Sequence, residues 1–231
     1  MTALLVGVAL AGCGDDSEPT SQKAAAENTA AAATPSEAPE GRLLTSQEAK
    51  AVLPAVTDLP GSGWKPSPTG ADESDPKVSP ESCSPVMNEI STDFLGYKSK
   101  LAAKENVTFA NDTTGQTELL FEVASWTEEA DSGLPLAAAK LADQCKSFTA
   151  TGEGVELKFT AETLSPLPIG DEQAAVRLTA DYQGTKVYLT VFEAKIGHNL
   201  VSMVQTSPEP TDRSAEYKPI LDAMLAKLKA A

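Results

Sequence analysis

The residue types that carry most enzyme chemistry are scarce in this chain. Its 231 residues include one histidine and three cysteines. The histidine, His198, stands in "IGHN", where glycine and asparagine favour a turn, so we expect a solvated or structurally satisfied imidazole there rather than a general base. Serines and acidic residues are plentiful, but no G-x-S-x-G elbow, S-x-x-K motif or glycine-rich phosphate loop singles one out. The sequence therefore predicts a protein that is not an enzyme.

Metal ligands are also poorly grouped. The segments "DESD" (72–75) and "NDTTG" (111–115) could hold calcium weakly, but neither approaches the D-x-D-x-D-G…E pattern of a calcium loop. Cys83 and Cys145 lie far apart in a chain with a single histidine, which makes a poor zinc site. We expect charged loops here, with no bound metal and no cofactor.

Cys13 follows the apolar run "ALLVGVALAG" (3–12). Ten helical residues span about 15 Å, half of a hydrocarbon core, so the run is too short to cross a membrane but fits the apolar region of a signal peptide. Leu10-Ala11-Gly12-Cys13 resembles the lipobox of bacterial lipoproteins, in which the cysteine is diacylated and the chain is cut just before it. No Lys or Arg precedes the run, unlike the usual signal peptide. The alternative is a signal-peptide fragment or a buried N-terminal helix with a coincidental cysteine.

The segment after Cys13 has almost nothing to bury. Residues 14–41 contain no aromatic residue, Leu, Ile or Val, and carry six acidic residues against one lysine. Such a composition predicts disorder and a flexible reach of roughly 30 Å. The predicted organisation is a signal peptide (1–12), a lipidated cysteine with an acidic tether (13–41), and one domain (42–231). Two acyl chains on Cys13 would suffice for stable membrane anchoring on the outer face.

The number of cysteines and the net charge limit which bonds and which classes of binding partner we expect. If Cys13 carries lipid, Cys83 and Cys145 remain as one disulfide pair in an oxidising compartment, with a metal site as the weaker alternative. The formal net charge is −15, and the domain lacks a cluster of Lys and Arg. An acidic surface of this kind argues against nucleic acid and against direct adhesion to anionic lipid.

The domain is expected to be α+β, with an antiparallel sheet and helices packed on one face. Hydrophobic periodicity and turn residues predict the elements. Helices are expected at 45–54, where Thr45 and Glu48 form a capping box, at 80–94, at 134–148, and at the C-terminus with Pro219 in the first turn. A turn-rich surface loop anchored by Trp64 is expected at 58–80. Strands are expected in "ENVTFAN", "TELLFEVASW", "VELKFTAETL", "QAAVRLTADY", "TKVYLTVFEA" and "NLVSMVQT".

The predicted hairpin around Gln183-Gly184 assigns side chains to the two faces of the sheet. Its register pairs Val176 with Val191 and places Ala180, Leu178, Val187, Leu189 and Val204 on the same face, the expected core face. The opposite face carries Arg177, Thr179, Tyr188, Thr190, Phe192, Val201 and Met203, and is more apolar than a solvated face should be. Either another segment, such as the Trp64 loop, covers this face, or it lines a ligand groove. The candidate binding residues are Arg177, Tyr188, Phe192 and Met203.

Several segments together resemble a known family. They are "LLTSQEAKAVLP", "TDLPGSGWK", the cysteine-bearing "ESCSPVMNEI" and "LADQCKSF", and "PIGDEQAAVRLTA" with "KIGHNLVSMVQ". In this succession the chain resembles actinobacterial surface lipoproteins and the extracellular sensor domain of PknH-type receptor kinases. The resemblance implies helices against an antiparallel sheet and a cleft for an unidentified ligand. The kinase sensor has more than one disulfide, whereas this chain can form only Cys83–Cys145.

Two functions remain open from the sequence. The first is an envelope lipoprotein that acts as a non-enzymatic, sensor-like module and binds a small amphiphile or envelope component. The alternative is a lipoprotein that docks another envelope protein and has no small ligand. A groove should be concave and apolar, whereas a docking face should be flatter.

Overall fold

The computed structural model describes residues 42–68, 76–84, 101–113, 117–127, 136–152, 154–211 and 213–230. The predictions for Cys13, the apolar run before it and the tether lie outside these residues. So do "DESD" and most of the helix expected at 80–94. All of these described residues belong to one compact unit. No helix among the described residues is long and apolar enough to cross a membrane.

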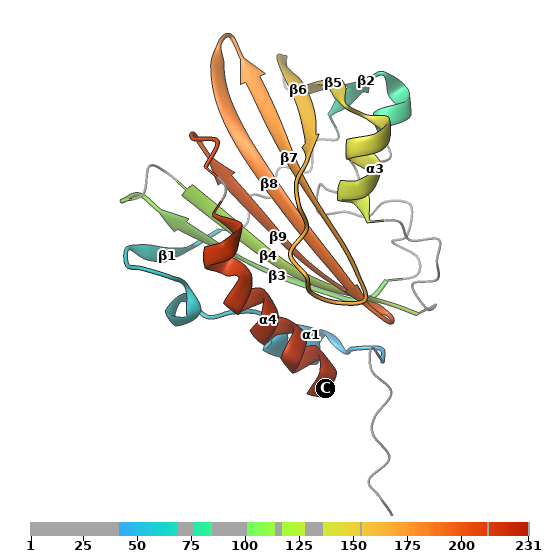
Figure 1. The fold of residues 1–231 in the computed structure, drawn as a ribbon, viewed down its shortest axis with the longest axis vertical. Coiled ribbons are helices and arrows are strands. Elements are labelled where there is room, and N and C mark those ends of the chain that lie inside the picture. The colour runs from blue at the N-terminus through green and yellow to red at the C-terminus, as the bar shows by residue number, and fades with distance from the viewer. Residues whose placement is uncertain are drawn as a thin grey trace, which may run out of the picture. The chain divides into compact units, whose positions relative to one another are not determined.

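The described residues form a nine-stranded antiparallel sheet in the order β1-β3-β4-β9-β8-β7-β6-β5-β2 (Figure 1). The long central strands are the ones that alternation in the sequence predicts. The strand bounds are β1 (Trp64–Ser67), β2 (Lys77–Ser79), β3 (Leu101–Asn111), β4 (Thr117–Trp126), β5 (Ser147–Gly152), β6 (Val155–Thr163), β7 (Glu172–Tyr182), β8 (Thr185–Ile196) and β9 (Asn199–Ser207).

The register predicted for the β7–β8 hairpin is confirmed. Val176 pairs with Val191, Leu178 with Leu189 and Ala180 with Val187, and Val191 pairs in turn with Val204 on β9. Gln183 and Gly184 both have positive φ, 53° and 88°. Two positive φ values in a two-residue loop match the right-handed twist of the flanking strands, which is why this dipeptide sets the register.

In the described part of the chain, three α-helices and two short 3-10 helices accompany the sheet: α1 (Ser46–Val52), α3 (Ala137–Gln144), α4 (Ser214–Ala230), η1 (Val56–Asp58) and η2 (Glu81–Cys83). The capping box of α1 forms as expected, since Thr45 accepts from the Glu48 amide and the Glu48 carboxylate accepts from the Thr45 amide. α4 begins earlier than predicted. Pro219 therefore lies inside the helix instead of in its first turn.

The helices cover both faces of the sheet, so the prediction that they pack on one face is corrected. α4 and α1 bury the face that carries Phe121, Phe192 and Met203. α3 buries the alternate residues, which include Val176 and Val191. Side chains alternate across a strand. One face has the apolar set that includes Val176 and Val191, and the other has an apolar row of Ala175, Phe192 and Met203, so each face requires a cover.

The segment expected to be a surface loop at 58–80 contributes the two edge strands, β1 and β2. Trp64 begins β1, packs against the α4 side of the core and donates from Nε1 to the Pro60 carbonyl at 2.9 Å. The helix expected at 134–148 ends at Gln144, and Phe148 belongs to β5 instead. That strand was missed because its short, threonine-rich sequence follows a helical stripe directly.

The disulfide between Cys83 and Cys145 is present. It joins η2, beside the edge strand β2, to the residue that ends α3. Both cysteines are buried in the α3 side of the core. The bond therefore links η2, which follows the edge strand β2, covalently to the end of α3, the helix that covers the central strands.

Candidate functional site

Two of the four candidate binding residues are part of the core. Phe192 is 2% exposed and Met203 is fully buried, and both belong to the cluster that includes the apolar side of α4. They pair with each other across β8 and β9, between Ala175 and Phe121. The prediction that Phe192 and Met203 line an open groove is therefore corrected, because α4 covers them.

The next step along the same strands is polar. Arg177, Thr190 and Gln205 pair across β7, β8 and β9 in one row, and each lies two residues from a member of the apolar row below it. Because alternate residues share a face, this polar row faces the same side of the sheet as Phe192 and Met203. Moving two residues along each strand thus changes the side chains on this face from apolar to polar.

A further row lies beyond it. Thr179, Tyr188 and Ser207 pair across the same three strands and are the outer row on this face. Tyr188 and Thr179 are half-buried. Of the four candidates, Arg177 and Tyr188 therefore remain at the part of the face that borders solvent, on neighbouring strands and in adjacent rows.

Three buried polar atoms, two in the polar row and one in the first turn of α4, have no hydrogen-bond partner within the described part of the chain. They are Arg177 Nε, Gln205 Oε1 and the Tyr217 hydroxyl, and we call these three residues the polar cluster. Gln205 is 2% exposed and Tyr217, in the first turn of α4, is fully buried. Tyr217 belongs to the same core cluster as Phe192 and Met203.

The cost of such atoms makes the polar cluster a candidate site. An unpaired buried polar group costs about 1–3 kcal/mol, so three of them cost about 3–9 kcal/mol. A domain is stable by about 5–15 kcal/mol in total. A penalty of this size calls for a compensating partner, and a bound ligand or ordered water can supply it.

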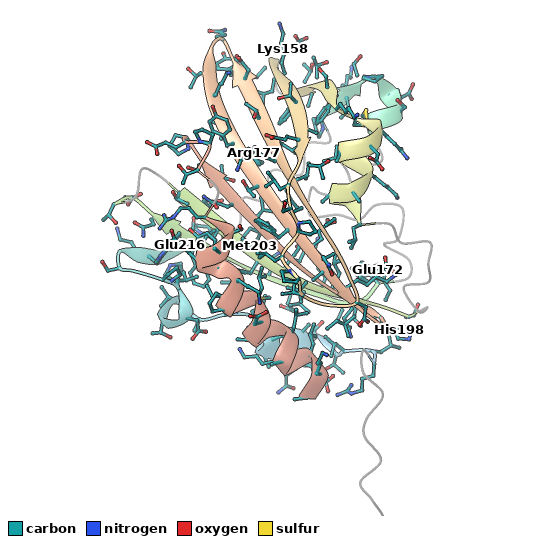
Figure 2. All side chains as sticks on the ribbon, in the orientation of Figure 1. Lys158, Glu172, Arg177, His198, Met203 and Glu216 are labelled. Carbon is teal, nitrogen blue, oxygen red and sulfur yellow. A yellow bond between two sulfur atoms is a disulfide. The ribbon has the colours of Figure 1, made fainter. Side chains whose placement is uncertain are left out.

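Arg177 connects the cluster to the surface. Its side chain is 14% exposed, and Nη1 lies 3.9 Å from Oε2 of Glu162, whose own side chain is 70% exposed. The guanidinium therefore extends from a buried, unpaired Nε to a solvated ion pair. Figure 2 shows Arg177 on the sheet beyond the N-terminal end of α4, whereas Met203 lies at the level where that helix begins (Figure 2).

Burial also changes the chemistry of Tyr217. Desolvation raises the pKa of its phenol above the usual 10.0, and the nearby Arg213 partly opposes this shift. The hydroxyl is therefore neutral at physiological pH and can both donate and accept a hydrogen bond.

His198 is held by contacts with the backbone of Trp126. Its Nδ1 lies 2.9 Å from the Trp126 carbonyl oxygen, and the Trp126 amide donates to the His198 carbonyl at 3.1 Å. These contacts join the β8–β9 turn to the end of β4. No group of three or more metal-ligating side chains occurs among the residues that the structure describes.

A small pocket lies elsewhere, between the α1–η1 connection and α4. It has a volume of about 220 Å³ and is lined by Pro54, Asp58, Pro219 and Lys227 among others. Lys227 Nζ lies 3.4 Å from the carbonyl oxygen of Val52, at the end of α1. The described residues that line this pocket include one acidic and one basic side chain, Asp58 and Lys227, and none of their buried polar side-chain atoms lacks a hydrogen-bond partner. The polar cluster is therefore the stronger candidate.

Sequence reasoning missed two members of the cluster. Gln205 lies two residues after Met203 on the same strand, and alternation places it on the candidate face. Tyr217 lies on the buried side of α4, with Ile220, Leu221 and Met224. Its unpaired hydroxyl had no signal in the sequence, because pairing depends on which groups the fold places around it.

The fold is similar to that of a solved extracellular domain. No protein-family model and no curated protein matches the sequence. The crystal structure of the extracellular domain of PknH from Mycobacterium tuberculosis superposes with a TM-score of 0.61 at 14% identity, covering 83% of this chain and 100% of that one. A putative uncharacterized protein from Mycobacterium smegmatis, an Rv0999 ortholog, gives 0.45 at 14% identity, covering 81% and 97%. The resemblance seen in the sequence is thus confirmed as a likeness in fold to the PknH extracellular domain.

Proposed function

We propose that this protein is an exported, non-enzymatic binding module of the cell envelope, similar to an extracellular sensor domain. In this proposal residues 1–12 are a signal peptide, Cys13 carries the lipid that anchors the chain outside the membrane, and 13–41 form the tether. Residues 42–231 form the domain that binds a ligand. The observation that carries the binding activity is the polar cluster, whose three buried atoms lack partners within the described residues.

Two further observations support the proposal. The neighbour in fold is described as the extracellular domain of a protein from an actinobacterium. The disulfide between Cys83 and Cys145 suits an oxidising, extracytoplasmic compartment. An enzyme is disfavoured because the single histidine is held by backbone groups of β4.

Native mass spectrometry of the full exported chain, taken from its own host, tests the binding activity. We expect an additional mass that is retained under native conditions and leaves when the chain is denatured. A chain that carries no additional mass, together with a specific crosslink to a second envelope protein, would favour the alternative of a docking lipoprotein without a small ligand.

The anchor has a separate test, because binding and anchoring can fail independently. Cells fed a labelled fatty acid should incorporate label into the protein, and Cys13→Ala should abolish incorporation. Label that persists in Cys13→Ala would refute the lipid assignment and leave the binding proposal intact.

A further inference from the structure

We infer that the pocket between the α1–η1 connection and α4 binds a small zwitterion with a short apolar side chain, the class of the aliphatic α-amino acids. The pocket has a volume of about 220 Å³, and none of the residues that line it belongs to the polar cluster. The inference therefore goes beyond the proposed function: it assigns a second site, which can fail without affecting the first.

The floor of the pocket is apolar and held in place by its surroundings. Its buried lining residues are Pro54, Ile220 and Met224. Ile220 and Met224 stand one turn apart on α4 and belong to the same core cluster, so core packing fixes their positions. Pro54 and Pro219, one from each of the two elements that form the pocket, have a backbone φ fixed by their own rings. A floor prepared in this way favours an apolar group of the ligand, and little conformational freedom is lost when that group binds.

The rim of the pocket carries one carboxylate and one ammonium group, those of Asp58 on η1 and Lys227 on α4, which are both exposed. Asp58 Oδ2 accepts a hydrogen bond from the Ala55 amide at 2.8 Å, which orients the carboxylate. Lys227 Nζ lies 3.4 Å from the carbonyl oxygens of both Val52 and Leu53, and hydrogen bonds of this length are weak. Each charged group therefore keeps hydrogen-bonding capacity for a ligand.

These two charges favour a ligand that carries both signs. The ion pairs of the described residues include neither Asp58 nor Lys227. An α-amino acid has an ammonium group, a carboxylate and a side chain on one carbon atom. Its ammonium group can donate to Asp58, its carboxylate can accept from Lys227, and its side chain can contact the apolar floor. A ligand with a single charge would make only one of the two ionic contacts.

The volume of the pocket sets the size of the ligand. Since one water molecule occupies about 30 Å³ in the liquid, the pocket holds the equivalent of about seven water molecules. An amino acid with a side chain as large as that of valine or leucine fits this volume. A drug-sized ligand does not, because its pockets begin at about 300 Å³.

The test follows Met224 by NMR in the full exported chain, isotope-labelled at the methyl groups of methionine. Met224 lines the pocket, whereas the fully buried Met203 does not, so Met203 is an internal control. The Met224 signal is identified by its loss in Met224→Leu. Titration with L-leucine up to about 20 mM, above the millimolar dissociation constant expected for so small a ligand, should shift the Met224 signal and leave the Met203 signal in place.

Two analogues keep the leucine side chain and each lack one charge. Isocaproate lacks the ammonium group, and isopentylamine lacks the carboxylate. Each should bind about threefold more weakly than leucine, because each loses one ion pair at an exposed rim. Asp58→Asn should remove the preference for leucine over isocaproate. Lys227→Met, which keeps the aliphatic stem, should remove the preference for leucine over isopentylamine.

The matched control is the exposed ion pair of Lys65 and Asp112, which does not line the pocket. Lys65→Met and Asp112→Asn should leave the affinities for all three probes unchanged. A Met224 signal that does not move with leucine would overturn the inference, as would leucine binding no tighter than that of either analogue. Preferences that Asp58→Asn and Lys227→Met both retain would also overturn it. A native adduct on a chain that does not bind leucine would refute this inference while the proposed binding function stands.

Discussion

Tyr217→Phe should make the ligand-free protein more stable. The Tyr217 hydroxyl is fully buried and has no hydrogen-bond partner among the described residues, so the folded protein carries its desolvation cost without compensation. Removing that oxygen while keeping the ring should raise the free energy of unfolding by about 1 kcal/mol, the lower end of the usual cost. For a domain of this size the melting temperature should rise by about 2–4 °C.

The pH dependence provides a second measurement of the same hydroxyl. Burial raises the pKa of Tyr217 above its usual 10.0, so the folded state holds the proton more tightly than the unfolded state. The associated stability is present below pH 10.0 and is lost as the pH rises through the folded pKa. A phenylalanine ring cannot ionise, so the advantage of Tyr217→Phe over the unchanged chain should grow above that pH.

The assay is thermal and urea unfolding followed by circular dichroism, on protein stripped of ligand. Tyr182→Phe is the matched control, because Tyr182 is 43% exposed and its hydroxyl contacts water in both states. Its stability should stay within about 0.5 kcal/mol of the unchanged chain. A Tyr217→Phe variant that is less stable by about 1 kcal/mol or more would show that the hydroxyl is hydrogen-bonded, for example by an ordered water, and would refute the reasoning behind the polar cluster.

The remaining predictions concern the frame that holds the site. Gly170→Ala should destabilise the fold more than Gly154→Ala: both glycines have positive φ, but a Cβ at Gly170 would lie 2.9 Å from a carbonyl oxygen of β8, whereas nothing lies within 4 Å at Gly154. Unfolding in urea would give the difference, and equal losses would show that the contact relaxes. A Cys83→Ala/Cys145→Ala double variant removes the disulfide and should lower the free energy of unfolding by about 4 kcal/mol in the chain-entropy model for a separation of 62 residues. Calorimetry of the variant and of the disulfide-bonded protein would measure this loss. A hydrogen bond from Arg42, and next those from Thr45, lower the pKa of Glu48 from 4.5 to about 2. The stability that this contributes is present above pH 4.5 and is lost as the pH falls through about 2. Glu48→Gln should therefore reduce the loss of unfolding free energy at acidic pH, and an unchanged loss would contradict this.

Much of the sheet could be predicted from local sequence. The register of β7, β8 and β9 follows from alternating residues and from Gln183-Gly184, a dipeptide that accepts the two positive φ values of the turn. The capping box of α1 is equally local, because its donors and acceptors lie within four residues. These features depend on backbone sterics and short-range hydrogen bonds, which neighbouring residues specify.

The edge strands β1 and β2 could not be predicted in this way. Each is short, and β1 contains a proline, so neither shows the alternation of a buried strand. Each becomes a strand because a longer neighbour, β3 for β1 and β5 for β2, offers its backbone groups for pairing at the edge of the sheet. Pairing with residues far along the chain therefore decides their conformation.

The sequence by itself determined that Arg177, Tyr188, Phe192 and Met203 share one face, because alternation along three strands paired in register leaves no other arrangement. Only the tertiary structure decided that α4 covers Phe192 and Met203 and that polar atoms of Arg177, Gln205 and Tyr217 are buried without a hydrogen-bond partner among the described residues. Burial and hydrogen-bond pairing depend on the packing of segments that are distant in the chain, and no local pattern of residues encodes which groups will lie together.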